Sequence, residues 1–450
     1  MSLLDDAVAR YHKNFESPAS NDLGWVEEIQ AKMASLHLAP GGRSVCPVLR
    51  PHFLPRKQAD AISKSAEALY GAFGRLSGML LSTPALFNRL EMLPAEKMLA
   101  TVEPGYSQMS ITCALNAQVN GSGARFVEAD LTNPAGFAFS ENLADALFDS
   151  KPVKELRKKY KLSRSGSKKK LLNSVLAAYK GSGKKKFPRI AIVETRPPFK
   201  NEPGADNETL AEHFRQAGYP TEVVTPEQLD YRNGVLCRGD FGIEIVYRRV
   251  SAQEFLFRFE LAHPLLRAYR DGAVCVVNSF RSEILQKKAI LALLTDETVV
   301  DKFPAAERKA IREHIPWTRV VAPVKTLREG KTIDLPEFIL HNRQNLVLKP
   351  NDNATDMHSY RGWELEAPAW ERAVKTALRS PYVVQDRVDA PRATFPVWQF
   401  GKVEMKQMAV DVHPLMLLGK TDSLSATVRD ATSSFSTLVG TAPVFVIEGK

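Results

Sequence analysis

Short apolar segments alternate with helical segments between Pro188 and about Phe280. The predicted strands are PRIAIVET, PTEVVTPEQL, GIEIVYRRV and AVCVVNSF, and the segment ETLAEHFRQAG is predicted to be a helix that ends at Gly218. Strands that alternate with helices in this way are joined by crossovers, which produce a parallel sheet. The sequence therefore predicts an α/β fold with a parallel-sheet domain at residues 187–280.

The segments on either side have different patterns. From Arg56, RKQADAISKSAEALYGAFGRLSGMLL has apolar residues at three- and four-residue spacing, which predicts a long amphipathic helix. Residues 281–450 begin with helical segments and end with predicted strands, among them LVLKP, YVVQDRV and APVFVIE. Because 450 residues exceed what one core usually holds, we expect three units, at 1–186, 187–280 and 281–450.

The net charge of +10 is concentrated in one segment. Residues 151–186 contain 14 Lys and Arg residues against one acidic residue, Glu155, so the rest of the chain carries about −3. Only Tyr160 and Tyr179 could stack on bases there, which does not favour a single-stranded nucleic acid. This basic segment is either a solvated helix and loop or a site for a polyanion or protein partner.

Several classes of protein are excluded by what the sequence lacks. It has no GxxxxGKS/T, GxGxxG, HExxH or GxSxG motif, and its four cysteines are far apart with no CxxC pair. Scattered cysteines of this kind indicate reduced thiols rather than a structural zinc site. No apolar run approaches the roughly 18 residues of a membrane helix, and the first residues have no apolar signal core. We expect a cytoplasmic protein without membrane contact.

Two segments have residues suited to binding a phosphate and its metal. In RFVEADLTNPAG, Glu128 and Asp130 are two apart, so on a strand both carboxylates share one face and could chelate Mg²⁺. Lys349 follows three apolar strand residues in LVLKP, where an ammonium group could hold a phosphate. The alternatives are an exposed strand face for the carboxylates and a solvated loop for the residues after Lys349.

A third segment, YVVQDRV, ends a predicted buried strand with Gln385, Asp386, Arg387 and Val388. The amide of Gln385 and the backbone groups that follow it could contact the edge of an adenine. An edge strand or a hinge is the alternative.

The order of these segments carries more information than any one of them. A carboxylate strand comes first, then the α/β domain, then SEILQKKAILALLTDE, HIPWTRVV, LVLKPND, YVVQDRV and VEMKQMAVDVHPLMLLGK. From about Arg50 to the end, this order resembles the circularly permuted ATP-grasp proteins. That group includes glutathionylspermidine synthase and is similar in layout to eukaryotic-type glutathione synthetase.

The resemblance implies a circularly permuted ATP-grasp fold with a Rossmann-like pre-ATP-grasp domain and a helical N-terminal region. In that arrangement residues 1–186 hold the permuted ATP-grasp strands and residues 281–450 the nucleotide-binding part. The implied cofactors are ATP and Mg²⁺, and the implied reaction joins a peptide-like acid to an amine through an acyl phosphate. Such a reaction needs no protein nucleophile, so no catalytic residue is assigned. The sequence makes no prediction of the oligomeric state.

The resemblance also assigns site residues. Lys349 and Lys288 match the family's two nucleotide-side lysines, with Lys287 as the alternative to Lys288. Gln385, Asp386 and Val388 match the hinge beside adenine. The magnesium ligands are Glu128, Asp130 in place of the family's Asn, and Asn353; Glu404 and Asp411 are secondary acidic candidates.

Other positions depart from the family pattern. The run NATDMHSYR has no glycine where the family has a glycine-rich loop, and Asp356 adds negative charge there. The stretch GYSQMSITC lacks the family's Arg-x-Asp, Arg429 is out of register, and Ser434 stands near the expected Asn. Two hypotheses follow: an active carboxylate–amine ligase, or a degenerate ATP-grasp protein that binds a nucleotide or a partner without turnover.

Overall fold

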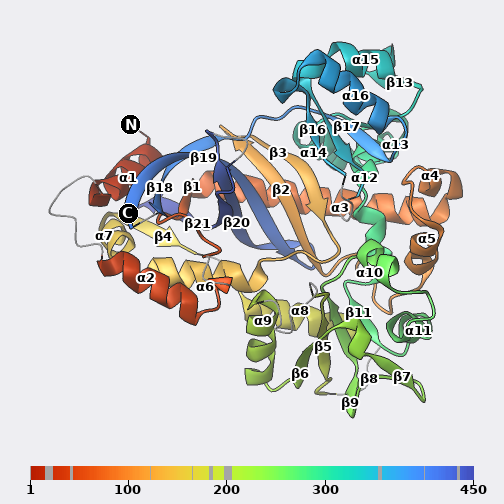
Figure 1. Ribbon diagram of the computed structural model, residues 1–450, viewed down its shortest axis with the longest axis horizontal. Helices are drawn as coiled ribbons and strands as arrows, with labels where there is room; N and C mark the ends of the chain where they lie inside the picture. The colour runs from red at the N-terminus through yellow and green to blue at the C-terminus, as the bar shows by residue number, and fades with distance from the viewer. Residues whose placement is uncertain are drawn as a thin grey trace.

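The computed structural model describes residues 2–15, 24–40, 44–121, 123–164, 166–181, 186–196, 205–352, 357–399, 401–432 and 436–450. Within these residues the chain forms one eight-stranded sheet, two four-stranded sheets and two small antiparallel sheets, with helices around them (Figure 1). The predicted α/β fold is confirmed.

The largest sheet is built from strands near both ends of the chain. Its order is β1-β21-β20-β19-β2-β3, with β18 paired to β19 and β4 paired to β21. The strands are β1 (His52–Pro55), β2 (Thr112–Asn120), β3 (Gly123–Asp130), β4 (Tyr160–Ser163), β18 (Arg392–Gln399), β19 (Lys402–Leu417), β20 (Lys420–Asp430) and β21 (Val439–Gly449). The sequence patterns did not predict β1, β2, β4 or β20.

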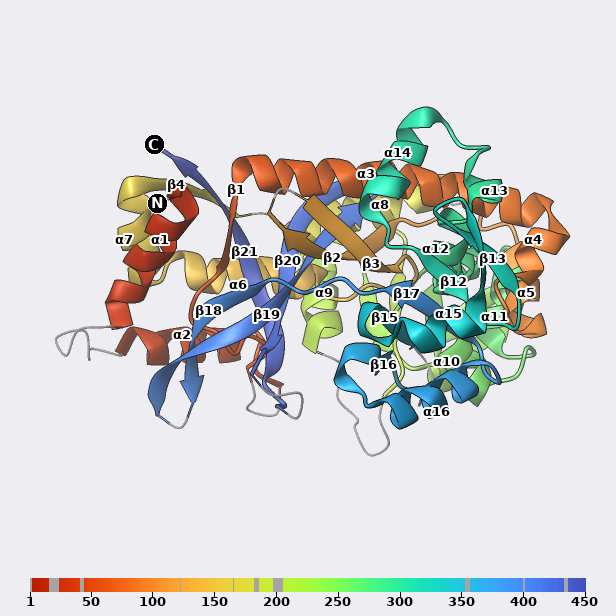
Figure 2. The same cartoon turned by 90° about the horizontal axis from the view of Figure 1, so that it is seen from above.

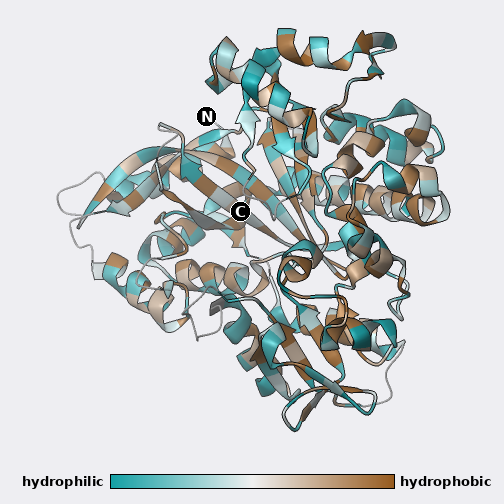
Figure 3. Cartoon of the chain, turned by 45° about the vertical axis from the view of Figure 1, so that its right-hand side comes forward, coloured by the Kyte–Doolittle hydropathy of each residue, from teal (hydrophilic) through white to brown (hydrophobic). Residues whose placement is uncertain are grey.

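Helix α3 (Arg56–Ser82) runs along one face of this sheet, as its apolar spacing predicts (Figure 2). Its buried Ile62, Leu69 and Leu76 belong to the same core as Leu115 and Val410 of the sheet. Each such side chain contributes roughly 2 kcal/mol by leaving water. The long strands carry both hydrophobic and hydrophilic residues (Figure 3), which suits a sheet with one apolar and one polar face.

The predicted parallel sheet is confirmed, in the order β11-β10-β5-β6. Its strands are β5 (Ile190–Val193), β6 (Thr221–Val224), β10 (Ile245–Arg248) and β11 (Cys275–Val277). The segment GIEIVYRRV divides between β10 and β9 (Phe241–Ile243), which joins β7 (Asp230–Arg232) and β8 (Val235–Arg238) in a small sheet. Helices α8 (Lys168–Lys180) and α9 (Ala205–Gln216) cover one face, so the cover of this sheet begins before residue 187.

The third sheet has the order β12-β17-β15-β16. Its strands are β12 (Thr318–Val320), β15 (Leu346–Pro350), β16 (Tyr360–Arg361) and β17 (Tyr382–Asp386). Helices α15 (Leu335–His341) and α16 (Ala367–Ala377) pack on one face around Trp370, which leaves the other face toward the large sheet. A hairpin of β13 (Lys325–Arg328) and β14 (Lys331–Asp334) lies beside them.

Shorter elements connect these layers. They are α1 (Leu3–His12), η1 (Lys13–Phe15), α2 (Gly24–Ser35), α4 (Pro84–Asn88), α5 (Pro94–Thr101), α6 (Phe137–Phe148), α7 (Lys151–Lys159), η4 (Pro226–Gln228), α10 (Ala252–Arg258), α11 (Pro264–Arg270), η5 (Phe280–Leu285), α12 (Ala289–Leu294), α13 (Glu297–Val300), α14 (Ala305–His314), η6 (Arg343–Asn345) and η7 (Gly362–Glu364).

Two expectations about the environment of the chain can be compared with the structure. Cys46, Cys113 and Cys275 are buried, Cys237 is half-buried, and all four are free thiols. Across the part of the chain that the structure describes, no helix has the length and apolar character to cross a bilayer. The cytoplasmic location stays a prediction.

Candidate functional site

Lys349 lies where the third sheet meets the large sheet. Along β15, Leu346 and Leu348 point into the core under α15 and α16, so Lys349 points to the opposite face. Its Nζ donates to the carbonyl of Val127 at 3.2 Å and lies 3.8 Å from Oε1 of Glu128. The predicted lysine and the first predicted carboxylate are therefore brought together by strands of two different sheets.

Lys288 is the second cation at this place. It is the N-cap of α12, its backbone N–H donates to the carbonyl of Asn351 at 2.9 Å, and its side chain is buried. Burial lowers the pKa of Lys288, partly offset by Glu128 and Asp352. Burial also lowers the pKa of Lys349, and the positive charge of Lys288 lowers it further, against the opposing effect of Glu128. An anion bound between these two lysines would raise the pKa of both and so favour their charged forms.

The large sheet adds a third cation and a second carboxylate. Asp411 of β19 is 2% exposed, and its Oδ2 lies 2.7 Å from Nη1 of Arg429 in β20. Two residues further along β19, Nε2 of His413 lies 2.9 Å from Oγ1 of Thr427. Like Glu128, Asp411 partly offsets the lowering of the pKa of Lys349, so its carboxylate lies within electrostatic reach of that lysine. We call Glu128, Lys288, Lys349, Asp411 and Arg429 the sheet junction.

The two secondary acidic candidates for metal binding, Glu404 and Asp411, lie in different parts of the large sheet. Asp411 belongs to the sheet junction, whereas Glu404 is paired on the surface with Lys402 at 2.7 Å and Lys406 at 3.6 Å. Arg429, out of register in the sequence comparison, reaches the site through its pairing with Asp411. A local signal for Asp411 did exist, because an acidic residue between Val410 and Val412 indicates a strand with one polar face.

Four buried side-chain oxygens on strands β2, β17 and β19 accept no hydrogen bond from the described residues. They are Asn116 Oδ1, Gln118 Oε1, Gln385 Oε1 and Asp411 Oδ1. The amide nitrogen of Gln385 donates to Oγ1 of Thr318 at 3.1 Å, which fixes the direction of its oxygen. A buried acceptor without a donor costs about 1–3 kcal/mol, so these atoms favour a ligand that brings N–H or O–H groups or a cation.

Asp130 has a different role from Glu128, although the two share a strand face. Glu128 lies opposite Asn116, and Asp130 lies opposite Ala114. Oδ1 of Asp130 accepts hydrogen bonds from the backbone N–H groups of Thr132 at 3.0 Å and Asn133 at 3.1 Å, which shapes the turn after β3.

A magnesium site can be tested against these donors. Asn353, the third predicted ligand, lies outside the described residues, as do Asp356 and Ser434. Among the side chains that are described, no group of three or more His, Cys, Asp and Glu residues could hold a metal ion. Mg²⁺ usually takes one or two carboxylates and completes its shell with water and phosphate oxygens. Glu128 and Asp411 fit that partial set.

Gln385 and Asp386, two of the three predicted adenine-side residues, have their side chains on opposite faces of β17. Gln385 lies on the face that Lys349 shares, whereas the carboxylate of Asp386 points to Arg328, with distances of 2.7 and 3.3 Å. Val388 is half-buried, two residues beyond β17. Asp386 and Arg328 line an open cavity of about 580 Å³ together with Glu329, Phe338, Asn342, Asn345, Leu346, Arg387 and Asp389.

The parallel sheet has its own polar cluster, which the sequence analysis did not predict. β6 and β10 flank β5 on opposite sides, and ligands of open α/β sheets bind at the strand ends where the order reverses in this way. Glu194, just after β5, lies 2.9 Å from Arg196. Just after β10, Arg249 donates to the carbonyls of Asn133 at 2.6 Å and Pro134 at 2.5 Å. Charged residues directly after buried strands were the available signal.

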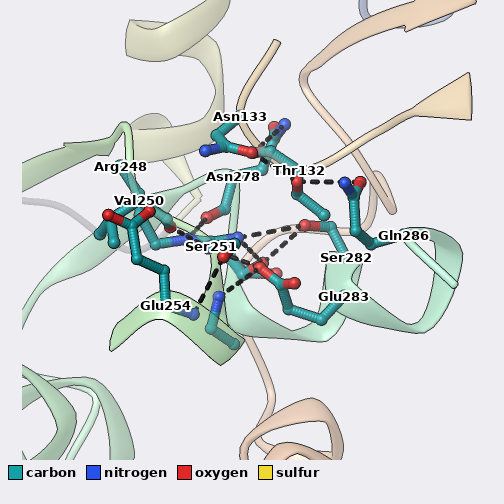
Figure 4. A network of polar contacts seen from close by, with 12 residues as sticks. Thr132, Asn133, Arg248, Val250, Ser251, Glu254, Asn278, Ser282, Glu283 and Gln286 are labelled. Atoms are coloured by element: carbon teal, nitrogen blue, oxygen red, sulfur yellow. Dashed lines mark hydrogen bonds and ion pairs between the residues drawn. The ribbon is translucent and has the colours of Figure 1, made fainter. Parts of the chain in front are cut away.

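A buried polar network joins this sheet to η5 and to the turn after β3 (Figure 4). Arg248 is fully buried and donates to Glu283 of η5 at 2.5 Å and to the carbonyl of Asn278 at 3.0 Å. The amide of Asn278 donates to the carbonyls of Leu131 and Thr132, both at 3.0 Å. β10, β11, η5 and the turn after β3 are therefore fixed to one another.

The described residues of the basic segment lie in two parts of the molecule. α7 and β4 lie at one end of the molecule and α8 lies nearer its middle (Figure 1). Lys170 of α8 is 3.0 Å from Asp422, and Lys159 of α7 is 2.7 Å from Asp6. Several cations are thus neutralised within the chain. A polyanion or protein partner stays a prediction.

Comparisons with known proteins bear on the fold. No protein-family model matches the chain, and no curated protein matches it in sequence. Among solved structures, a glutathione synthetase-like effector from Globodera pallida, in its apo form, is similar over 96% of this chain and 99% of that chain, with 12% identity and a TM-score of 0.62. A putative gamma-glutamylcysteine synthetase from Methylobacillus flagellatus covers 86% of each chain, with 11% identity and a TM-score of 0.40.

The similarity to the effector extends over nearly the whole of both chains, and it agrees with the resemblance seen in the sequence. At 12% identity it concerns the fold. The chain has the fold of this glutathione synthetase-like effector.

Proposed function

We propose that this protein is an ATP-dependent ligase that joins a carboxylic acid to an amine. The observation that carries the proposal is the contact of Lys349 with Glu128, with Lys288 buried beside them. The two buried ammonium groups of Lys288 and Lys349 lie close to the carboxylate of Glu128. Cations and a carboxylate placed together in this way suit the binding of a triphosphate and its metal ion. The order of the segments, with β3 before the parallel sheet, supports the circularly permuted arrangement.

The residues present fit ATP and Mg²⁺. Lys288 and Lys349 would hold the phosphates, while Glu128 and Asp411 would supply carboxylate oxygens to the metal ion. The free amide oxygen of Gln385 suits the amino group of an adenine. Asp130, Asn353 and Val388 stay predicted members of the site, and Asp386 stays one through its backbone groups. Bound ATP would supply the phosphoryl group that converts the acid into an acyl phosphate with release of ADP, and the amine would then displace inorganic phosphate from it.

The acid would be held next to the parallel sheet. The cluster after β5 and β10 supports this position, because it contains Arg196 and Arg249 and because the network of Figure 4 ties the parallel sheet to the turn after β3, the strand that carries Glu128. The chain's contribution to the reaction would be orientation and neutralisation of charge, rather than a covalent step.

The second candidate is a protein that binds a nucleotide or a partner without turnover. One observation favours it: Lys349 and Arg429 are already paired with the chain's own Glu128 and Asp411. A bound triphosphate would have to compete with these carboxylates or recruit them to its metal ion.

ADP formation distinguishes the two candidates. The wild type and Lys349→Met would be incubated with ATP, Mg²⁺ and pairs drawn from a panel of short peptides and primary amines. The proposal expects ADP release that needs both an acid and an amine and that is lost in Lys349→Met. ATP binding without ADP release from any pair would favour the second candidate.

A further inference from the structure

Lys287, next to Lys288 in the sequence, lies in a buried cluster of charges away from Glu128. Its side chain is 4% exposed, and its Nζ lies 2.8 Å from Oε1 of Glu96. The same ammonium group donates to Oδ2 of Asp352. Glu96 comes from α5, and Asp352 follows β15 three residues after Lys349. One lysine thus joins two carboxylates from distant parts of the chain.

Each carboxylate has a further partner. Oε2 of Glu96 accepts the backbone N–H of Leu93 at 2.8 Å, which caps α5. With its amide nitrogen turned toward Asp352, Gln253 of α10 donates to both carboxylate oxygens, at 2.8 and 2.5 Å. Asp352 is therefore bound by Lys287, which lies between η5 and α12, and by Gln253 of α10.

The residue before Asp352 is held as firmly. The amide of Asn351 donates to the carbonyl of Leu90 at 2.9 Å and accepts the backbone N–H of Ala289 at 2.8 Å. Its carbonyl accepts the backbone N–H of Lys288. Two consecutive residues at the end of β15 are thus fixed by buried polar contacts, which sets the direction in which Lys349 points.

We propose that Lys287 is a positioning residue for nucleotide binding. Through Asp352 it fixes the end of β15, and so the ammonium group of Lys349, relative to Glu128. Gln253 joins the same carboxylate to α10, which begins three residues after Arg249 of the parallel-sheet cluster. Lys287 does not touch the nucleotide. The inference rests on the proposed function only for its effect on ATP; the fixing of β15 is independent of it.

A purely structural role for this cluster makes a different prediction. If Lys287 served only overall stability, its loss would increase backbone opening throughout the chain. If it positions β15, the increase is concentrated in residues 346–352, α10 and α5, because Lys287 and Asp352 hold these elements together. Local hydrogen exchange separates the two possibilities.

The test uses the full chain and four variants. Lys287→Met removes the charge and keeps most of the volume, Lys287→Arg keeps the charge, and Lys288→Met removes the neighbouring cation. Lys309→Met, at a side chain 74% exposed, is the control. Amide hydrogen exchange is measured by mass spectrometry without ATP, and the dissociation constant of Mg²⁺–ATP is measured by calorimetry.

The positioning role predicts faster exchange in peptides covering 346–352 and 252–258 of Lys287→Met, with residues 408–417 unchanged. ATP affinity falls about tenfold, which corresponds to about 1.4 kcal/mol, and Lys287→Arg restores most of both effects. Lys288→Met weakens ATP binding without changing exchange. Weaker ATP binding in Lys287→Met with unchanged exchange would overturn the inference, since Lys287 would then contact the nucleotide.

The two proposals fail separately. If the wild type binds no ATP, the proposed function fails, and a local rise in exchange at 346–352 still supports the anchoring of β15 by Lys287. A uniform rise, or no change there, overturns it. Should Lys287→Met not fold, Asp352→Asn keeps the shape of that side chain and removes its charge pair with Lys287, and the same local change is expected from it.

Discussion

The ammonium group of Lys349 in β15 lies 3.8 Å from the carboxylate of Glu128 in β3. This contact joins the helix-covered third sheet to the polar face of the large sheet. It depends on the pairing of β3 with β2, which in turn pairs with β19. A cation and a carboxylate held this way by two sheets define the place where the proposed nucleotide would bind.

The lowered pKa of Lys349 predicts a pH dependence of stability. Between the lowered value and the ordinary lysine value of about 10.4, the unfolded chain binds more protons than the folded one. The free energy of unfolding contributed by this group therefore rises with pH in that window. Urea denaturation at several alkaline pH values should show this slope reduced in Lys349→Met. Lys309→Met should keep it, and equal slopes in wild type and Lys349→Met would contradict the assignment.

Glu128→Gln tests the metal side of the sheet junction. The change removes a negative charge beside Lys288 and Lys349 but keeps the shape of the side chain. We expect ATP affinity without Mg²⁺ to be unchanged or higher, and the gain in affinity from Mg²⁺ to fall about tenfold. Calorimetry with and without Mg²⁺ measures both. Glu404→Gln, in a surface ion pair, is the control; an undiminished Mg²⁺ effect in Glu128→Gln would rule out this ligand.

Arg248→Met should destabilise the fold strongly. The change leaves the buried carboxylate of Glu283 without its partner, and breaking a buried pair typically costs about 3–5 kcal/mol. Chemical denaturation measures the loss. Adding Glu283→Gln to the variant should recover part of it, and Arg238→Met, which breaks a surface pair with Glu222, should cost less than about 1 kcal/mol. A small loss in Arg248→Met would show that the network of Figure 4 does not hold the domains together.

The hinge residues Gln385 and Asp386 should differ in their effect on nucleotide binding. Gln385→Leu removes the free oxygen at the junction face, so we expect a loss of about 1 kcal/mol, or roughly fivefold, in ATP affinity. Asp386→Asn should change ATP affinity by less than about twofold, because that carboxylate is bound to Arg328 on the other face. Affinities measured for ATP and GTP with both variants check this. A larger loss of ATP affinity in Asp386→Asn than in Gln385→Leu would contradict the conclusion that Gln385, and not the carboxylate of Asp386, faces the nucleotide.

Local sequence patterns predicted the parts of the fold that depend on local periodicity. The strands of the parallel sheet, helix α3 and strand β3 all follow from apolar spacing, and the i, i+2 spacing put Glu128 and Asp130 on one face. The pattern could not show that Asp130 bonds to its own turn. That distinction depends on the conformation of Thr132 and Asn133, which spacing does not determine.

Long-range pairing was the part that the sequence could not show. Asp411 and Arg429 meet because β19 and β20 pair, and β20 has too many polar residues to stand out as a strand. Lys287 and Lys288 differ in role only because the chain turns at the start of α12, which directs one toward Glu96 and the other toward Glu128.

The central claim is that the sheet junction binds ATP through Lys349. Its most direct test is calorimetric titration of Mg²⁺–ATP into the wild type and Lys349→Met, with folding of both checked by circular dichroism. The account predicts saturable binding to the wild type and at least about tenfold weaker binding to the variant. Equal affinity in the two proteins, or no binding to the folded wild type, would contradict it.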